Sequence, residues 1–218
     1  MYEVEQKFRI ASADAFHEKL ASLGVRWRNR VFEIDTYLKH PARNFVETGE
    51  ALRIRRQWVV DLVGEPCSAT FCAFLTYKGP KLDVLTKTRR ETELPLGDRI
   101  AFAPERLPLG ETLFFEEGDL PTLPGADEWI ETMKILGFVP VQPVKKVRMK
   151  TSWQHQGWNL EITFDRVAAA GVFAEIEAIA EALEDIGVAQ DAVLDLAQSL
   201  GLNDVEPKSY LSLVMDKK

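Results

Sequence analysis

Cysteine and histidine are scarce in this sequence, which argues against one kind of metal site. The 218 residues include two cysteines and three histidines. Cys67 and Cys72 have neither a second cysteine pair nor a histidine cluster nearby, whereas zinc sites show such ligands at characteristic spacings. His17, His40 and His155 show no arrangement typical of a catalytic dyad. We therefore expect no zinc centre and give the cysteines a packing role.

Long apolar runs and an excess of positive charge are also missing. No eighteen apolar residues run together, and residues 1–7 do not resemble the start of a secretory signal. These features predict a cytoplasmic protein with no membrane association. The formal net charge is −7, whereas a surface that binds DNA or RNA is usually basic. Nucleic acid is therefore not expected as a partner, and any phosphate ligand should be small and held locally.

What the sequence does have is strand periodicity in a chain of one-domain size. Its hydrophobic fraction of 46% is enough for a substantial core, and we expect a single domain over residues 1–218. At the start of the chain, Glu3, Glu5 and Lys7 alternate with apolar Val4 and Phe8. A period of two predicts a strand over residues 2–10.

Similar signals recur along the chain and predict a mixed α+β fold. The other expected strands cover residues 32–38, 51–57, 71–78, 88–94, 146–153, 158–165 and 172–178. A hairpin turn is expected at His155, Gln156 and Gly157. Amphipathic helices are predicted over residues 12–24, 129–137 and 189–200, and a short closing segment over residues 209–214.

Two regions leave alternatives open. Residues 95–125 contain five prolines and an acidic stretch, so little regular structure is expected, and the segment is either a lid or an inert insertion. Residues 173–183 fit both a strand and a helix. As a strand they place Glu175 and Glu177 on one face, and as a helix they make these carboxylates diverge.

The charged positions of the predicted strands separate by sign. Carboxylates two residues apart occur as Glu3/Glu5, Glu91/Glu93 and Glu175/Glu177, and cations as Arg53/Arg55 and Lys146/Arg148. An open sheet with one wet face explains any single strand. Repetition of the pattern favours a closed barrel, because eight strands enclose room for one small ligand. So many enclosed charges require water, metal ions and an anionic guest.

These residue types indicate a polyphosphate clamp. Paired carboxylates suit hard, oxygen-seeking cations such as Mg²⁺ or Mn²⁺. Arginine grips phosphoryl oxygens by paired hydrogen bonds, and lysine does so as a point charge.

The order of the motifs resembles the CYTH superfamily, the triphosphate tunnel metalloenzymes. Glu3-Val4-Glu5-Gln6-Lys7 is similar to its ExExK signature. Further matching segments are Asp35-Thr36-Tyr37, Leu52-Arg53-Ile54-Arg55, Lys78-Gly79-Pro80, Arg89-x-Glu91-x-Glu93, Lys146-x-Arg148, Asp165, Gly171-x-Phe173-x-Glu175-x-Glu177 and Pro207-Lys208-Ser209-Tyr210. The resemblance spans residues 2–214 and is greatest to the CyaB-type, class IV adenylyl cyclase-like branch. It implies a closed eight-stranded antiparallel β-barrel with a few amphipathic helices packed outside, and it favours a strand at residues 172–178.

The resemblance also implies roles for individual residues. The expected metal ligands, for Mg²⁺ or Mn²⁺, are Glu3, Glu5, Glu91, Glu93, Asp165, Glu175 and Glu177. The expected triphosphate-binding residues are Lys7, Arg53, Arg55, Lys78, Arg89, Lys146 and Arg148. Catalytic roles are expected for Glu3, Glu5, Lys7 and Lys78. The roles of Asp35 and Tyr37 stay open between structure and catalysis.

Three functions fit this resemblance. The first is metal-dependent hydrolysis of a triphosphate such as ATP, thiamine triphosphate or tripolyphosphate. The second is cyclisation of ATP to cyclic AMP and pyrophosphate, and the third is binding of polyphosphate or nucleotide without turnover. No compact base-recognition motif separates them. The oligomeric state stays open between a monomer and a homodimer.

Overall fold

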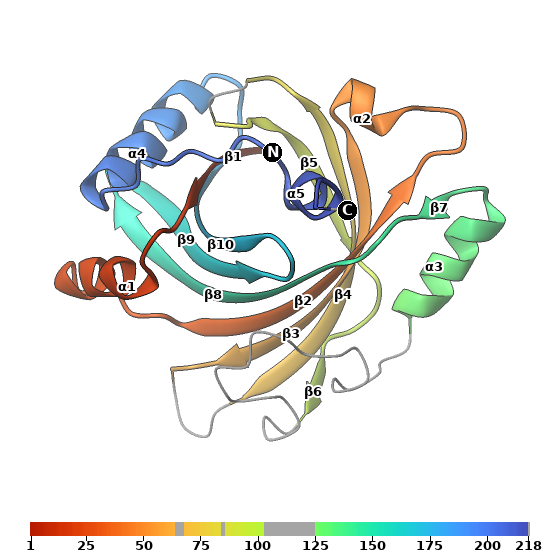
Figure 1. Cartoon of the computed structure of the whole chain (residues 1–218), viewed down its shortest axis with the longest axis horizontal. Coiled ribbons are helices and arrows are strands. Elements are labelled where there is room, and N and C mark those ends of the chain that lie inside the picture. The colour runs from red at the N-terminus through yellow and green to blue at the C-terminus, as the bar shows by residue number, and fades with distance from the viewer. Residues whose placement is uncertain (64–67, 84–85, 103–124, 218) are drawn as a thin grey trace.

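Eight antiparallel strands close into a barrel, as expected. The computed structural model describes residues 1–63, 68–83, 86–102 and 125–217. The barrel strands are β1 (Tyr2–Arg9), β2 (Asn29–Lys39), β3 (Ala51–Asp61), β4 (Ala69–Lys81), β5 (Arg89–Pro95), β8 (Val144–His155), β9 (Trp158–Val167) and β10 (Gly171–Ala180). They follow the order β3-β2-β8-β9-β10-β1-β5-β4, and pairing between β3 and β4 closes the ring (Figure 1).

Two short strands extend this barrel. β7 (Val139–Pro140) pairs with β2, and β6 (Ile100–Phe102) pairs with β4 at Ala69–Phe71. Within residues 95–125, where little regular structure was expected, the described part adds the three-residue β6 beyond the end of β5. β4 extends past the end of β5, and its free backbone groups there are paired by β6. Residues 103–124, where a lid was considered, lie outside the described residues.

Most of the apolar core lies outside the barrel wall, because the apolar parity of the strands points mainly outward. Val4, Leu160 and Ile176 are buried against α1 (Ala13–Ser22) and α4 (Ile186–Ser199), which Figure 1 shows together on one side. A second cluster around Phe32 and Ile54 is covered by α3 (Ala126–Ile135). The charged parity is thereby left facing inward.

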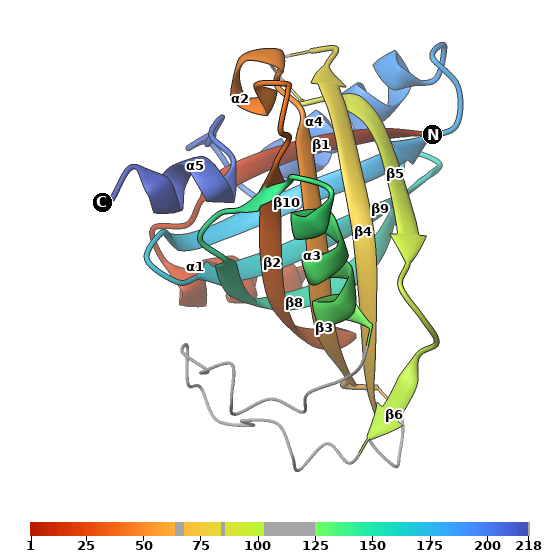
Figure 2. The same cartoon turned by 90° about the vertical axis from the view of Figure 1, so that its right-hand side faces the viewer.

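The remaining helices lie near the ends of the barrel. α5 (Tyr210–Met215) falls within the barrel outline in Figure 1 and at one end in Figure 2. We call this the α5 end. The short α2 (Phe45–Thr48), which was not predicted, connects β2 to β3. In the described part of the chain, every helix falls short of the length and apolarity that a bilayer crossing requires.

Local sequence signals explain most element boundaries. The Ser12 hydroxyl accepts a hydrogen bond from the Ala15 N–H and caps α1, as its position predicted. The expected hairpin turn holds Gln156 and Gly157 at φ of 47° and 83°, a pair of positive angles typical of a type I′ turn. Residues 171–180 form β10, so the strand alternative is confirmed over the helical one.

The packing of helices on the outside of the barrel predicts which side chains are most costly to shorten. Leu196 of α4 is 1% exposed, so Leu196→Ala should reduce the free energy of unfolding by about 2–5 kcal/mol. On the same helix Val188 is 59% exposed, so Val188→Ala should change it by about 0.5 kcal/mol or less. Urea denaturation followed by circular dichroism measures both, and equal effects would contradict this packing.

Candidate functional site

A charged central cavity runs through the barrel, with a volume of about 1010 Å³. Its lining comes from the inward parity of the strands, as the alternation predicted, and from residues 207–212 at the α5 end. Charged side chains in it are unusually buried, among them Lys7 and Glu33, which are 2% and 1% exposed. Groups buried this deeply need partners of opposite charge.

Three carboxylates converge on one point of this cavity. Glu5 of β1 is the register partner of Glu177 of β10, and Glu3 precedes them on the same face of β1. Single carboxylate oxygens of Glu3, Glu5 and Glu177 lie within 4.8 Å of one another. We call these residues the acidic cluster.

Burial and the neighbouring charges shift the pKa of each carboxyl group in the acidic cluster. Burial, together with the nearby carboxylate of Glu3, holds the pKa of Glu177 well above its ordinary value. Burial also raises the pKa of Glu3, although Lys78 opposes this. Burial disfavours ionisation of Glu5 too, but Lys87 and Lys78 outweigh it and hold the pKa of that carboxyl well below its usual range. A divalent cation among these oxygens would relieve the repulsion, and an all-carboxylate donor set fits Mg²⁺ or Mn²⁺.

Lys78 and Arg89 adjoin this cluster. The Lys78 Nζ lies 2.6 Å from Glu3 Oε1 and 2.7 Å from Glu91 Oε2. Arg89 Nε lies 3.6 Å from Glu3 Oε2. Glu93 is exposed and accepts a hydrogen bond of 3.1 Å from Thr76 Oγ1. Of the two predicted ligands on β5, Glu91 therefore borders the acidic cluster, beside Glu3 and Lys78, whereas Glu93 is bonded to Thr76.

Facing residues on β2, β3 and β8 form a buried group of cations and carboxylates. Arg55 donates to both oxygens of Asp35, at 2.6 and 2.8 Å, and Arg53 donates to Asp35 Oδ2 at 3.2 Å. Lys146 Nζ lies 2.7 Å from Glu33 Oε2. Burial opposes ionisation of Asp35, but the two arginines lower its pKa. In this geometry Asp35 holds the two predicted phosphate-binding arginines in place.

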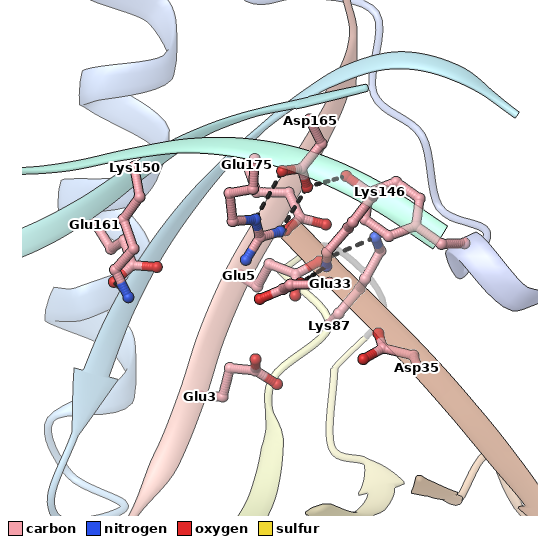
Figure 3. Close-up of polar contacts among 12 residues, drawn as sticks. Glu3, Glu5, Glu33, Asp35, Lys87, Lys146, Lys150, Glu161, Asp165 and Glu175 are labelled. Carbon is pink, nitrogen blue, oxygen red and sulfur yellow. Dashed lines mark hydrogen bonds and ion pairs between the residues drawn. The ribbon is translucent and has the colours of Figure 1, made fainter. Parts of the chain in front are cut away.

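Arg148 is held by two carboxylates that were predicted to bind metal. It donates to both oxygens of Asp165, at 2.6 and 2.5 Å, and also to Glu175 (Figure 3). Tyr210 of α5 donates to Asp165 Oδ2 at 2.7 Å. The structure therefore places Asp165 and Glu175 in an arginine-centred network rather than in the acidic cluster.

Lys7 connects this network to the α5 end. Its Nζ lies 4.0 Å from the centre of the Tyr210 ring, a cation–π contact. Burial lowers the pKa of Lys7 to about 8, with Glu175 opposing that shift. The amine is therefore still mostly protonated at neutral pH and available to an anion.

Two buried N–H groups in the cavity have no hydrogen-bond acceptor among the described residues. They are the Nε groups of Arg53 and Arg89. A buried donor without an acceptor is unfavourable, and phosphate oxygens are the acceptors that guanidinium groups bind best. The cavity therefore fits a polyanion together with a cation at the acidic cluster.

Among the cavity residues that sequence reasoning did not assign to the site are the buried Glu33 and Lys87. Glu33 shares the inward parity of Asp35 on β2, so its alternation carried the signal, but it was not assigned to the site. Lys87 lies in the connection between β4 and β5 and shares the parity of Arg89 and Glu91, but the predicted strand began one residue after it, at residue 88. Both side chains line the central cavity.

A smaller side pocket of about 460 Å³ adjoins the central cavity. The two share lining residues, among them Tyr37, Phe45 and Leu211. Apolar side chains such as Val46 and Val141 dominate its wall. Glu50 fixes the α2 segment at this pocket by accepting hydrogen bonds from Arg43, Thr48 and Tyr77.

Comparison with known proteins identifies the family. The family model described as the CYTH domain matches residues 1–210. The chain belongs to the CYTH family. Proteins of this family bind triphosphate substrates and in general depend on a metal ion.

Several relatives match this CYTH chain over nearly its full length. A Methanocaldococcus jannaschii protein, provisionally named an adenylate cyclase, is 27% identical over 98% of both chains. The PH1819 protein from Pyrococcus horikoshii is 30% identical, with a TM-score of 0.73 over 99% of both chains. A Hippeastrum protein described as having a dominant triphosphatase activity shares the fold, with a TM-score of 0.51 at 16% identity over 100% of this chain and 96% of that one.

The acidic cluster predicts opposite effects for two facing carboxylates. In metal-free buffer Glu177→Gln should raise the free energy of unfolding, because the folded state holds the pKa of Glu177 above its unfolded value. Glu5→Gln should lower it, because the Glu5 carboxylate is held by cations. A carboxyl with a raised folded pKa destabilises the protein increasingly as pH rises above its unfolded pKa. The benefit of Glu177→Gln should therefore be absent at low pH, grow with rising pH and level off above the folded pKa.

Thermal unfolding with a chelator, repeated across pH, measures both variants. An unchanged or lower stability for Glu177→Gln at neutral pH would contradict the assigned repulsion.

The role of Asp35 predicts a large cost for its removal. Asp35→Asn leaves two buried arginines without their shared carboxylate and should reduce the free energy of unfolding by about 3–5 kcal/mol. Asp127→Asn is the matched control, since Asp127 is 68% exposed and faces Arg56 at 3.5 Å. The control should cost about 1 kcal/mol or less in the same urea titration. Equal effects would show that Asp35 does not anchor the arginines.

Proposed function

We propose that this chain is a divalent-metal-dependent phosphohydrolase that cleaves a triphosphate carrying an organic group. One observation supports this most directly: the acidic cluster and a set of buried arginines and lysines line one cavity. An anion binder without turnover would gain affinity by losing negative charge, whereas this cavity retains carboxylates at its centre. Mg²⁺ or Mn²⁺ is the proposed cofactor.

In the proposed reaction the chain supplies positioning and charge. Glu3, Glu5 and Glu177 would hold the metal ion, which would polarise phosphoryl oxygens and orient water. Arg53, Arg55 and Arg148 present guanidinium groups whose directions are fixed by Asp35 and Asp165. Lys7, Lys78, Arg89 and Lys146 add positive charge around the phosphates. Such preorganised charge stabilises the transition state of phosphoryl transfer without rearrangement of the site.

Glu91, Glu93, Asp165 and Glu175 were also predicted as metal ligands, and their direct contacts lead us to propose other roles for them. Asp165 and Glu175 orient Arg148, and Glu91 orients Lys78. Glu93, bonded to Thr76, is not assigned a role.

The side pocket supports a substrate with an organic group. Ligand pockets are typically apolar concavities of about 300–1,000 Å³, and this one meets the phosphate-binding cavity at Tyr37 and Phe45. A nucleoside or thiamine group could occupy the side pocket while its phosphates extend toward the acidic cluster. Inorganic tripolyphosphate would use the central cavity alone.

Cyclisation of ATP is the second candidate, favoured by the provisional cyclase name of the M. jannaschii relative. It would use the same cations, with the ribose hydroxyl rather than water attacking the phosphorus next to the ribose. We favour hydrolysis over cyclisation because a dominant triphosphatase activity is described for the Hippeastrum protein.

The expected activity is tested with ATP, thiamine triphosphate and tripolyphosphate, each with Mg²⁺ and Mn²⁺. Free phosphate, pyrophosphate and cyclic AMP are measured together. We expect metal-dependent release of phosphate, with organic triphosphates preferred to tripolyphosphate. Cyclic AMP and pyrophosphate as main products would establish the cyclase alternative, and metal-independent binding without any product would establish a binder.

Glu177→Gln separates catalysis from folding, because it is expected to stabilise the protein. It should lower kcat/KM by about 100-fold or more through loss of a metal-holding carboxylate. Glu131→Gln, at a side chain 65% exposed on α3, is the control and should keep wild-type activity. Wild-type turnover by Glu177→Gln would exclude the acidic cluster as the metal site.

A further inference from the structure

Lys87 points into the central cavity although it belongs to none of the barrel strands. It lies in the connection between β4 and β5. Its side chain is 6% exposed, and its Nζ lies 3.4 Å from Glu5 Oε1 (Figure 3). The cavity that contains the acidic cluster is lined by Lys87 as well.

The backbone of Lys87 adopts a left-handed conformation with φ of 44°. Side chains other than glycine, asparagine and aspartate adopt this region at an energetic cost. Conformations of this kind persist only where the surrounding structure enforces them, and they concentrate at functional sites. The lysine is therefore held in place by its neighbours rather than by its own preference.

A buried polar network supplies that constraint. Thr86 donates to Asp83 Oδ2 from its backbone N–H at 2.9 Å and from its hydroxyl at 2.7 Å. Gln190 of α4 donates to the hydroxyls of Thr86 and Thr88, at 2.8 and 3.4 Å. The Glu5 N–H donates to the Thr86 carbonyl at 2.9 Å and joins the connection to β1. Both threonines are fully buried, so the residues on either side of Lys87 are anchored.

We propose that Lys87 binds the phosphates of the substrate and competes with the divalent cation for Glu5. This inference rests on the proposed function. Glu5 belongs to the acidic cluster, and its carboxylate cannot serve both a metal ion and a lysine at full strength. Once a cation neutralises Glu5, the Lys87 ammonium loses its partner, and phosphate oxygens in the same cavity become its acceptors. A lysine suits this exchange because its charge sits on a flexible stem.

The exchange predicts opposite changes in affinity for two ligands. Lys87→Met keeps the length and backbone cost of the side chain but removes its charge. It should weaken binding of tripolyphosphate, used as its non-hydrolysable imido analogue, to Mn²⁺-saturated protein by about tenfold or more, and weaken it less in chelator-treated protein, where Glu5 still holds Lys87. It should also tighten Mn²⁺ binding, measured without phosphate, by about threefold to tenfold, because the competing cation is gone. Isothermal titration calorimetry measures both constants, and neither requires turnover.

Two variants serve as controls. Lys87→Arg keeps the charge and should hold tripolyphosphate affinity within about threefold of wild type. Lys134→Met removes an exposed lysine on α3, far from the cavity lining, and should change neither constant.

A purely structural lysine would give a different result. Lys87→Met would then weaken both ligands together and lower the Tm, or leave tripolyphosphate binding unchanged, and either outcome overturns the inference. If wild-type protein binds no tripolyphosphate with or without Mn²⁺, the proposed function fails along with it. Tight wild-type binding that Lys87→Met leaves intact overturns only the role of Lys87.

Discussion

The closed barrel depends on pairing of charges among the buried side chains that line its central cavity. A carboxylate or guanidinium moved out of water costs several kcal/mol, which only a well-aligned partner can offset. Asp35 with Arg55 and Asp165 with Arg148 provide such partners in two-pronged geometry. At Glu3, Glu5 and Glu177 three carboxyl groups converge instead, and although Lys78 pairs with Glu3 and Lys87 with Glu5, the ionised form of Glu177 is only partly compensated. A metal ion would be stabilised at this point, where the negative charge of the carboxylates is not fully offset by cations.

The barrel tolerates this charged interior because its apolar residues face outward and its charged residues face inward. Apolar residues of the strands face outward to α1, α3 and α4, and charged residues face inward. Stability therefore comes mainly from packing between the barrel wall and its helices. The interior can keep groups that are unfavourable for folding, such as the ionised Glu177 carboxyl, because they do not have to provide the core. Binding chemistry and core packing occupy opposite faces of the same strands.

Alternation in the sequence was enough to predict the barrel strands and which side chains share a face. Closure into a ring was not contained in any one strand and came from the family resemblance. Parity alone could not predict which carboxylates form the acidic cluster. Glu175 and Glu177 share one face of β10, yet one contacts Arg148 and the other meets Glu5. Which side chain meets which depends on strand register and tilt across several strands, and local sequence carries little information on either. Lys87 shares the parity of Arg89 but was missed because it lies just before the predicted strand, in a connection whose left-handed backbone the sequence did not indicate.

Among the residues that the structure describes, the pairing of β1 with β5 is the shortest in the barrel wall. Its described register partners are Tyr2 with Arg90 and Glu3 with Arg89, and Thr86, in the connection before β5, adds a backbone hydrogen bond to Glu5. β1 is joined to β10, on its other side, along its whole length. Local opening of a barrel starts where the fewest backbone hydrogen bonds must break. Local separation of β1 from β5 would thus begin beside the carboxylates of Glu3 and Glu5. Any ligand that contacts both strands would oppose this opening.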